Sequence, residues 1–250
     1  MERLLAALIS LLLLAGVGVA QKQSPSQTVV AFYRALKEKR YVEGFRHSVY
    51  RGAVEGLTPA ELQDLESEFA RTFSEIPDKI EPKGEQIDRD TATVFLKFEG
   101  VDGVQQVALI RVAGEWLVGD QDSLALVRKQ GREFFFNTRM DVNEDEVYEA
   151  LSRLLGAEFI YAQKFAGNFT TLSELVRLGA LPKDLEAGES TGYKFALTLS
   201  DDKKSFYAVA TPSAYGKTGR LSFYVDIGGV RAEDLKGQPA SEKSPLYHSR

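Results

Sequence analysis

The sequence contains no cysteine, and this absence excludes several kinds of chemistry at once. Its 250 residues offer no thiol to form a disulfide, to attack a substrate or to bind a metal ion. Histidine is almost as scarce, because only His47 and His248 occur and they lie far apart in the chain. Neither has carboxylates around it at the spacing of a metal site. The sequence therefore predicts no metal ligands and no cofactor.

The common motifs of catalysis and phosphate binding are missing as well. The chain has no Gly-x-Ser-x-Gly elbow, no glycine-rich phosphate loop and no His-Glu-x-x-His zinc motif. Its net charge is −5 and it has no run of Lys and Arg, so it lacks the basic surface that nucleic-acid binding needs. We expect no catalytic residues and no nucleic-acid partner.

The chain opens with a long apolar run. Residues 4–14 are apolar except for Ser10, Arg3 precedes them, and the small residues Gly18 and Ala20 follow. A positive residue, an apolar stretch and a small-x-small site are typical of a secretory signal peptide. We predict a signal peptide over 1–20 and a periplasmic or secreted protein without a membrane span after cleavage. The alternative is an uncleaved anchor, because about 17 apolar residues are near the lower limit for crossing a bilayer.

Two helices are predicted in the segment that follows the leader. Apolar residues recur at helical spacing over 29–36, with Ser26 or Thr28 as the N-cap. Thr58-Pro59-Ala60-Glu61 is a capping box with proline at the first helical position, and it predicts a helix that runs to about Ser74.

Beyond Pro77 the apolar period changes to two, which indicates strands. Strands are expected at 91–98, 104–112 and 115–118, followed by a helix over 120–130. Short glycine-containing turns separate these strands, as in an antiparallel meander. Residues 21–130 are therefore predicted to form an α+β domain.

The second half of the chain predicts another α+β domain, over 143–235. Asn143 and Glu146 look like the start of a helix about 20 residues long. A short helix over 171–178 and an antiparallel sheet follow, with strands at 192–199, 205–210 and 221–226 and a final short strand. Residues 131–142 are predicted to be a linker. The polar residues 236–250 are predicted to be a disordered tail.

Two stretches of the first domain carry a resemblance to a known superfamily. They are Ser24-Pro25-Ser26-Gln27-Thr28-Val29-Val30-Ala31-Phe32-Tyr33-Arg34-Ala35-Leu36 and Gly114-Glu115-Trp116-Leu117-Val118. They resemble the first helix and the closing strand of the nuclear-transport-factor-2-like superfamily. The resemblance implies the cone-shaped α+β fold, with a curved antiparallel sheet, that this group shares with ketosteroid isomerases.

The second domain resembles the globular head of a type IV pilin or pseudopilin. The residues that carry this resemblance are Glu158-Phe159-Ile160-Tyr161-Ala162-Gln163-Lys164-Phe165, Gly167-Asn168-Phe169, Leu172-Ser173-Glu174-Leu175, Gly179-Ala180-Leu181-Pro182, Gly192-Tyr193-Lys194-Phe195 and Ser222-Phe223-Tyr224-Val225-Asp226. The resemblance implies a long helix packed on an antiparallel sheet. Pilins have a hydrophobic helix continuous with the head, whereas here a signal peptide and another domain precede it.

The cone of the first resemblance implies a pocket. Its candidate lining residues are Tyr33, Val94, Leu96, Phe98 and Trp116. An isomerase-like enzyme would need an acid or base with a shifted pKa in such an apolar cavity, and the three sheet residues of this set include no carboxylate. The alternative is that these side chains form the core.

The residues around Asn143 partly resemble a calcium loop. Asp141, Asn143 and Asp145 are spaced like the start of such a loop, but Glu146 and Ser152 stand where it needs Gly and Glu. Acidic residues at a helix start explain the pattern better.

Two further polar motifs have equally plain explanations. The aspartates Asp201, Asp202 and Asp226 fit turns between strands. Asn168-Phe169-Thr170 is a glycosylation sequon whose use depends on the host.

The absence of a catalytic constellation favours an exported, non-enzymatic protein that binds a protein or an envelope component. One alternative is a small-ligand binder or isomerase-like enzyme that uses the cone cavity. Another is an accessory protein of a type IV pilus or a type II secretion system.

Overall fold

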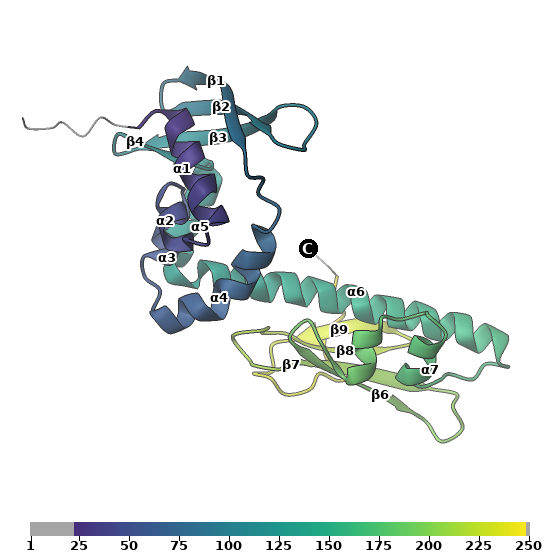
Figure 1. The fold of residues 1–250 in the computed structure, drawn as a ribbon. Helices are drawn as coiled ribbons and strands as arrows, with labels where there is room; N and C mark the ends of the chain where they lie inside the picture. Colours follow the sequence, from purple (N-terminus) through teal and green to yellow (C-terminus); the bar gives the residue numbers. More distant parts are fainter. Residues whose placement is uncertain (1–22, 249–250) are drawn as a thin grey trace, which may run out of the picture. The chain divides into compact units, whose positions relative to one another are not determined.

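The computed structural model describes residues 23–248, and within them the chain divides into two compact units near Arg128 (Figure 1). Each unit is α+β and contains one antiparallel sheet. The predicted signal peptide lies outside the described residues. Within 23–248, no helix combines the length and the apolar composition that crossing a membrane requires.

The N-terminal unit begins with four helices and ends with a fifth. They are α1 (Pro25–Lys37), α2 (Tyr41–Arg46), α3 (Arg51–Val54), α4 (Pro59–Thr72) and α5 (Gln121–Gln130). Between α4 and α5 the strands β1 (Ile80–Asp88), β2 (Thr91–Phe98), β3 (Gln105–Val112) and β4 (Glu115–Val118) form a sheet in the order β1-β2-β3-β4. The predicted meander and the helix after it are confirmed. Strand β1 is a fourth strand, beyond the three predicted for this sheet.

Capping side chains set where the first long helices begin. The Thr58 hydroxyl accepts a hydrogen bond from the backbone N–H of Glu61, whose carboxylate accepts one from the N–H of Thr58, so the predicted capping box of α4 is confirmed. The predicted N-cap of α1 was wrong. Ser24 fills that position, in its own capping box, because Pro25 suits the first helical turn.

The inner face of the first sheet packs against α1. Val29 of α1 lies against apolar residues of β2 and β3, and all of them are buried; the strand residues are Ala92, Val94, Leu96, Val107 and Leu109. Alternate residues of a strand point to the same face of a sheet, so the apolar residues that recur at every second position are buried together against α1. A second, aromatic cluster joins α2 to α4, with Tyr41 and Phe45 against Phe69 at centroid distances of 5.3 and 5.2 Å.

The C-terminal unit opens with helix where a linker was predicted. A short 3₁₀ turn, η1 (Gly131–Glu133), leads directly into α6 (Phe134–Lys164), a helix of 31 residues. The prediction that the helix starts at Asn143 was therefore wrong. Residues 132–142 contain neither Gly nor Pro, so nothing in them breaks a helix.

After α6 the chain forms two short helical elements and then a sheet, and α6 covers one face of that sheet (Figure 1). The remaining elements are α7 (Leu172–Arg177), η2 (Lys183–Ala187), β5 (Glu189–Ser190), β6 (Tyr193–Leu199), β7 (Phe206–Pro212), β8 (Ser222–Asp226) and β9 (Gly229–Glu233), with the strands in the order β5-β6-β7-β8-β9. Val147, Leu151 and Leu154 of α6 pack on the inner side of the sheet with Tyr193 and Phe223. The predicted order of long helix, short helix and sheet is confirmed.

The segment after β9 is ordered, so the predicted disordered tail is wrong over 236–248. The backbone N–H of Ala232 donates to the carbonyl of Pro245 at 3.1 Å, and the N–H of Tyr247 donates to Val230 at 2.9 Å. Backbone hydrogen bonds to a strand edge stabilise a polar segment whatever its side chains are, and composition does not reveal them.

Candidate functional site

The five side chains predicted to line a cone pocket lie together in the N-terminal unit. Val94 and Leu96 are fully buried in the core, and Tyr33, Phe98 and Trp116 pack against the same cluster. The rings of Tyr33 and Phe98 meet edge to face at 5.5 Å. These residues therefore contact one another as side chains in or against the core of the N-terminal unit.

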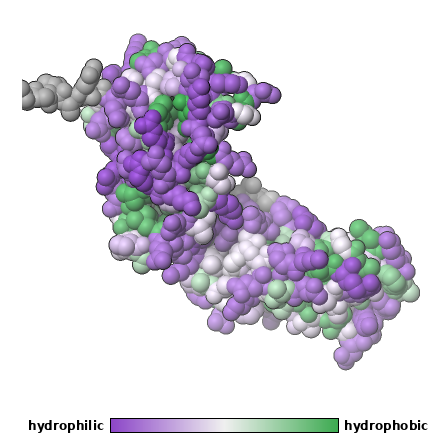
Figure 2. Space-filling view, in the orientation of Figure 1, coloured by the Kyte–Doolittle hydropathy of each residue, from purple (hydrophilic) through white to green (hydrophobic). Residues whose placement is uncertain are grey.

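A groove opens on the surface of the same unit, along a face of α1 that the sequence had not singled out. It has a volume of about 540 Å³, within the range usual for ligand sites, and it is open to solvent. It is lined by Gln23, Ser26, Gln27, Val30, Ala31, Arg34 and Pro82. Figure 2 shows a small hydrophobic patch in a hydrophilic surrounding over this part of the unit.

The groove combines an apolar floor with polar ends. Val30, Ala31 and Pro82 supply apolar surface, and Arg34 is exposed and forms no ion pair with the other described residues. At the N-terminal end of α1, the Glu85 carboxylate accepts hydrogen bonds from the N–H and the hydroxyl of Ser26, at 2.9 and 2.5 Å. Since helix N-termini attract anions, this contact ties β1 to α1 and shapes that end of the groove.

The groove has one ionisable side chain and one hydroxyl group among its lining residues. Arg34 is the only ionisable side chain among these lining residues. The Ser26 hydroxyl donates to the Glu85 carboxylate, which holds it at the N-terminal end of α1. An unpaired guanidinium beside apolar surface can hold a carboxylate.

The C-terminal unit contains a fully buried carboxyl group, Glu158 of α6. Its Oε2 accepts a hydrogen bond from the backbone N–H of Thr170 at 3.0 Å, and its Oε1 has no partner among the described residues. Burial raises the pKa of Glu158 to about 7, and the Thr170 hydrogen bond lowers it only in part. Such a group is half protonated near neutral pH, which marks it as a candidate functional residue.

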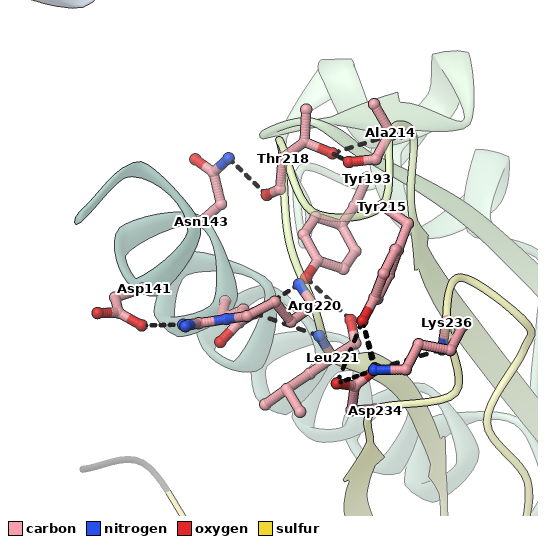
Figure 3. A network of polar contacts seen from close by, with 11 residues as sticks. Asp141, Asn143, Tyr193, Ala214, Tyr215, Thr218, Arg220, Leu221, Asp234 and Lys236 are labelled. Atoms are coloured by element: carbon pink, nitrogen blue, oxygen red, sulfur yellow. Dashed lines mark hydrogen bonds and ion pairs between the residues drawn. The ribbon is translucent and has the colours of Figure 1, made fainter. Parts of the chain in front are cut away.

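A polar network connects the first turns of α6 to the loop between β7 and β8 (Figure 3). The nearly buried Glu144 accepts hydrogen bonds through Oε1 from the backbone N–H groups of Arg220 and Leu221, at 2.7 and 3.2 Å. Arg220 also pairs with Asp141, and Asn143 donates to the carbonyl of Thr218 at 2.8 Å. These contacts fix the loop on the helix, so Asp141 and Asn143 serve structure and do not form a calcium loop.

A second group of contacts in Figure 3 holds the turn that follows β9. The Tyr215 hydroxyl donates to Asp234 at 3.0 Å, and the Lys236 ammonium donates to the Tyr215 hydroxyl at 2.7 Å and to Asp234 at 3.0 Å. All three side chains are exposed, so the network contributes little stability.

The remaining polar candidates are engaged in turns. Asp226 accepts from the N–H of Gly228 at 2.7 Å, and Asp202 accepts from the N–H of Lys204 at 3.0 Å. Across 23–248, no group of three or more His, Cys, Asp or Glu is placed to hold a metal ion. In the sequon, Asn168 is partly exposed whereas Phe169 and Thr170 are buried.

The sequence contains signals for both sites that the prediction missed. Gln27 and Arg34 lie seven residues apart on one face of α1, beside its apolar face, and Gln23 precedes the helix. Glu158 follows Leu151 by seven residues and Leu154 by four, which places a carboxylate in the apolar stripe of α6. A charged group in such a stripe is a reason to expect burial.

Comparison with known proteins gives little further information. No protein-family model matches the chain, and no curated protein matches it. Among solved structures, it is similar to a crystal structure described as a "Putative NTF2-like transpeptidase" from Campylobacter jejuni, with 14% identity and a TM-score of 0.28, over 40% of this chain and the whole of the other. That likeness is too weak to carry an argument. The described part of the chain is α+β, with two antiparallel sheets and the long helix α6.

Proposed function

We propose that this chain is an exported, non-enzymatic binding protein of the cell envelope, and that its binding site is the groove along α1. The occupant is an extended peptide segment of a partner protein that carries a carboxylate. The apolar floor of Val30, Ala31 and Pro82 accommodates its aliphatic atoms, and Arg34 pairs with the carboxylate.

The single observation that supports this function most strongly is the composition of the groove. It is of ligand-site size, it is open, and Arg34 is the one ionisable group among its lining residues. A site that performs acid–base or nucleophilic chemistry needs a group that gives or takes a proton near neutral pH. A site that recognises an anion needs a fixed cation and complementary surface, and the groove offers both.

The test is binding of a set of extended peptides that differ in charge, measured by fluorescence anisotropy. We expect peptides with an aliphatic residue beside Asp or Glu to bind, and Arg34→Glu to abolish that binding and favour Lys-containing peptides. Arg71→Glu makes the same charge change at an exposed position of α4 and is the matched control. Binding that is indifferent to Arg34, or no binding by any acidic peptide, would contradict the proposed site.

The non-enzymatic part of the proposal has its own test. A broad screen for hydrolase and isomerase activity should give no turnover. Reproducible turnover that a single point mutation abolishes would overturn this part of the proposal.

Export is proposed from the predicted signal peptide over 1–20. Fusion of residues 1–30 to a reporter enzyme that is active only outside the cytoplasm tests it. We expect activity from this fusion and none when two Leu residues of the apolar run are replaced by Arg.

An accessory role in a type IV pilus or type II secretion system is a second candidate. The observation that favours it is the order of elements in the C-terminal unit, where the long helix α6 is followed by α7 and an antiparallel sheet. Cross-linking of the full chain to pilin-like subunits in the native host would support this role, and its failure there would count against it.

A further inference from the structure

The segment 245–247 pairs with β9 at the edge of the second sheet, after the chain has turned back on itself. Arg231 of β9 and Leu246 form an antiparallel bridge, flanked by the hydrogen bonds from Ala232 to Pro245 and from Tyr247 to Val230. Residues 245–247 therefore extend the sheet by one short strand. Without them, β9 would present an unpaired edge of the kind that recruits another strand.

The surface that receives this segment has side-chain specificity as well as backbone partners. The Tyr247 ring sits between Tyr148 of α6 and Phe223 of β8, at centroid distances of 5.5 and 5.4 Å. The Ser244 hydroxyl donates to Glu233 at 2.8 Å, and Arg231 donates to the Ser244 carbonyl at 3.1 Å. Backbone pairing with pockets for selected side chains is the pattern of strand-addition sites. We refer to β9 with Tyr148 and Phe223 as the strand-acceptor site.

The connection between β9 and this segment is short and adopts an unfavourable backbone conformation. Residues 234–239 make the turn, and within it Lys236 and Gly237 both have positive φ, at 55° and 83°. A non-glycine residue in the left-handed region is strained. The exposed contacts of Lys236 with Tyr215 and Asp234 hold the turn on the surface. A strained hinge next to an exchangeable element favours domain swapping, because the same contacts form again between two copies.

We propose that residues 240–248 are an exchangeable strand, and that the strand-acceptor site of one copy binds this segment of a second copy. In the single chain the site is filled by the chain's own segment. In the exchanged pair the turn opens, the strain at Lys236 is released, and each copy donates its Tyr247 to the Tyr148 and Phe223 of the other. The partner chemistry is thus defined by the segment itself, an extended strand with Ser244 and Tyr247 as its anchors.

The experiment uses the full chain with Cys introduced at the bridged pair, Arg231→Cys together with Leu246→Cys. The native chain contains no Cys, and facing residues of an antiparallel pair have a geometry that a disulfide accepts. Isotopically heavy and light copies are mixed under reducing conditions, oxidised, digested and mapped by mass spectrometry. We expect a 231–246 disulfide between heavy and light peptides, in a fraction that rises with protein concentration. A disulfide found only between peptides of the same isotope at every concentration would overturn the proposal.

Two further measurements separate strand exchange from misfolding and from chance cross-linking. The single variant Leu246→Cys should form no heavy-to-light disulfide with the peptide of β9. Copies labelled with a donor or an acceptor dye at Ser241→Cys should develop energy transfer on mixing, and Lys236→Gly should lower the extent of transfer several-fold because it removes the strain from the closed turn. Absence of transfer between folded copies would contradict exchange.

Discussion

Glu144 accepts a hydrogen bond from the backbone N–H of Arg220 at 2.7 Å, although the two residues are 76 positions apart in the chain. Glu144 is 3% exposed, so its carboxylate depends on these protein donors in place of water. The contact fixes the loop between β7 and β8 against α6, and with it the position from which Tyr215 reaches the turn after β9.

Replacing Glu144 by Ala should destabilise the C-terminal unit strongly. The change leaves two backbone N–H groups without their acceptor and removes the carboxylate that pairs with the partly exposed Arg220, and a buried donor left unsatisfied costs about 1–3 kcal/mol. Asp141→Asn is the matched control, because Asp141 is partly exposed, and should cost under about 1 kcal/mol. Urea unfolding followed by circular dichroism measures both, and equal effects would contradict this account.

Gly219 is expected to tolerate no side chain. A Cβ at this position would lie 1.8 Å from the Tyr193 hydroxyl, which donates to the carbonyl of Leu221 at 2.9 Å. Gly219→Ala should therefore cost about 1–3 kcal/mol through the displacement of a fully buried ring. Gly156→Ala in α6 is the control, since nothing lies within 4 Å of its Cβ, and it should stabilise the helix by about 0.5–1 kcal/mol. A stable Gly219→Ala protein would show that the loop moves freely.

Thr58→Ala should lower the stability of the N-terminal unit by about 1 kcal/mol. The substitution removes the hydroxyl that accepts from the N–H of Glu61 and so leaves a first-turn donor uncapped. Ser67→Ala, which lies inside α4 and caps nothing, is the control. The melting temperatures of Thr58→Ala and Ser67→Ala test this prediction. An unchanged melting temperature for Thr58→Ala would mean that the cap does not stabilise the unit.

Glu158 should make the C-terminal unit less stable as the pH rises through neutrality. Burial raises the pKa of this carboxyl in the folded state to about 7 from its usual 4.5. The folded state therefore holds the proton more tightly than the unfolded state. The stability that the protonated group contributes is complete below about pH 4.5 and is lost as the pH rises to about 7. The difference corresponds to about 3 kcal/mol at most.

Glu158→Gln removes the charge and keeps the shape, so this variant should be more stable than the parent at pH 8 by about 1–3 kcal/mol and similar to it at pH 4.5. Glu149→Gln, at an exposed position of the same helix, should leave the pH dependence unchanged. Unfolding free energies measured at several pH values test this expectation. A parent and Glu158→Gln variant with parallel pH profiles would contradict it.

Elements defined by local signals were predictable from the sequence. The helix after Thr58 and the strands around Gly114 follow from a capping box, an alternating pattern and short turns, all within a few residues of one another. Alternation likewise places Val94 and Leu96 on the same buried face of β2.

Errors arose where distant contacts decide the structure. Asn143 and Glu146 have the spacing of a helix N-terminus, but Asn143 lies inside α6. Its side-chain amide donates a hydrogen bond to the carbonyl of Thr218, 75 residues away. The segment after β9 is polar, and its order depends on β9 and on the aromatic pair that receives Tyr247. No local pattern encodes such partners. The groove was missed because its residues become a site only when Pro82 of β1 lies beside α1.

Closure of the second sheet by residues 245–247 has a consequence for the order in which the chain can fold. A ribosome makes β9 before it makes Tyr247, so the edge of β9 and the rings of Tyr148 and Phe223 can be covered only after the last segment of the sheet has been made. Until those residues are in place, β9 has an open edge that can pair with another strand.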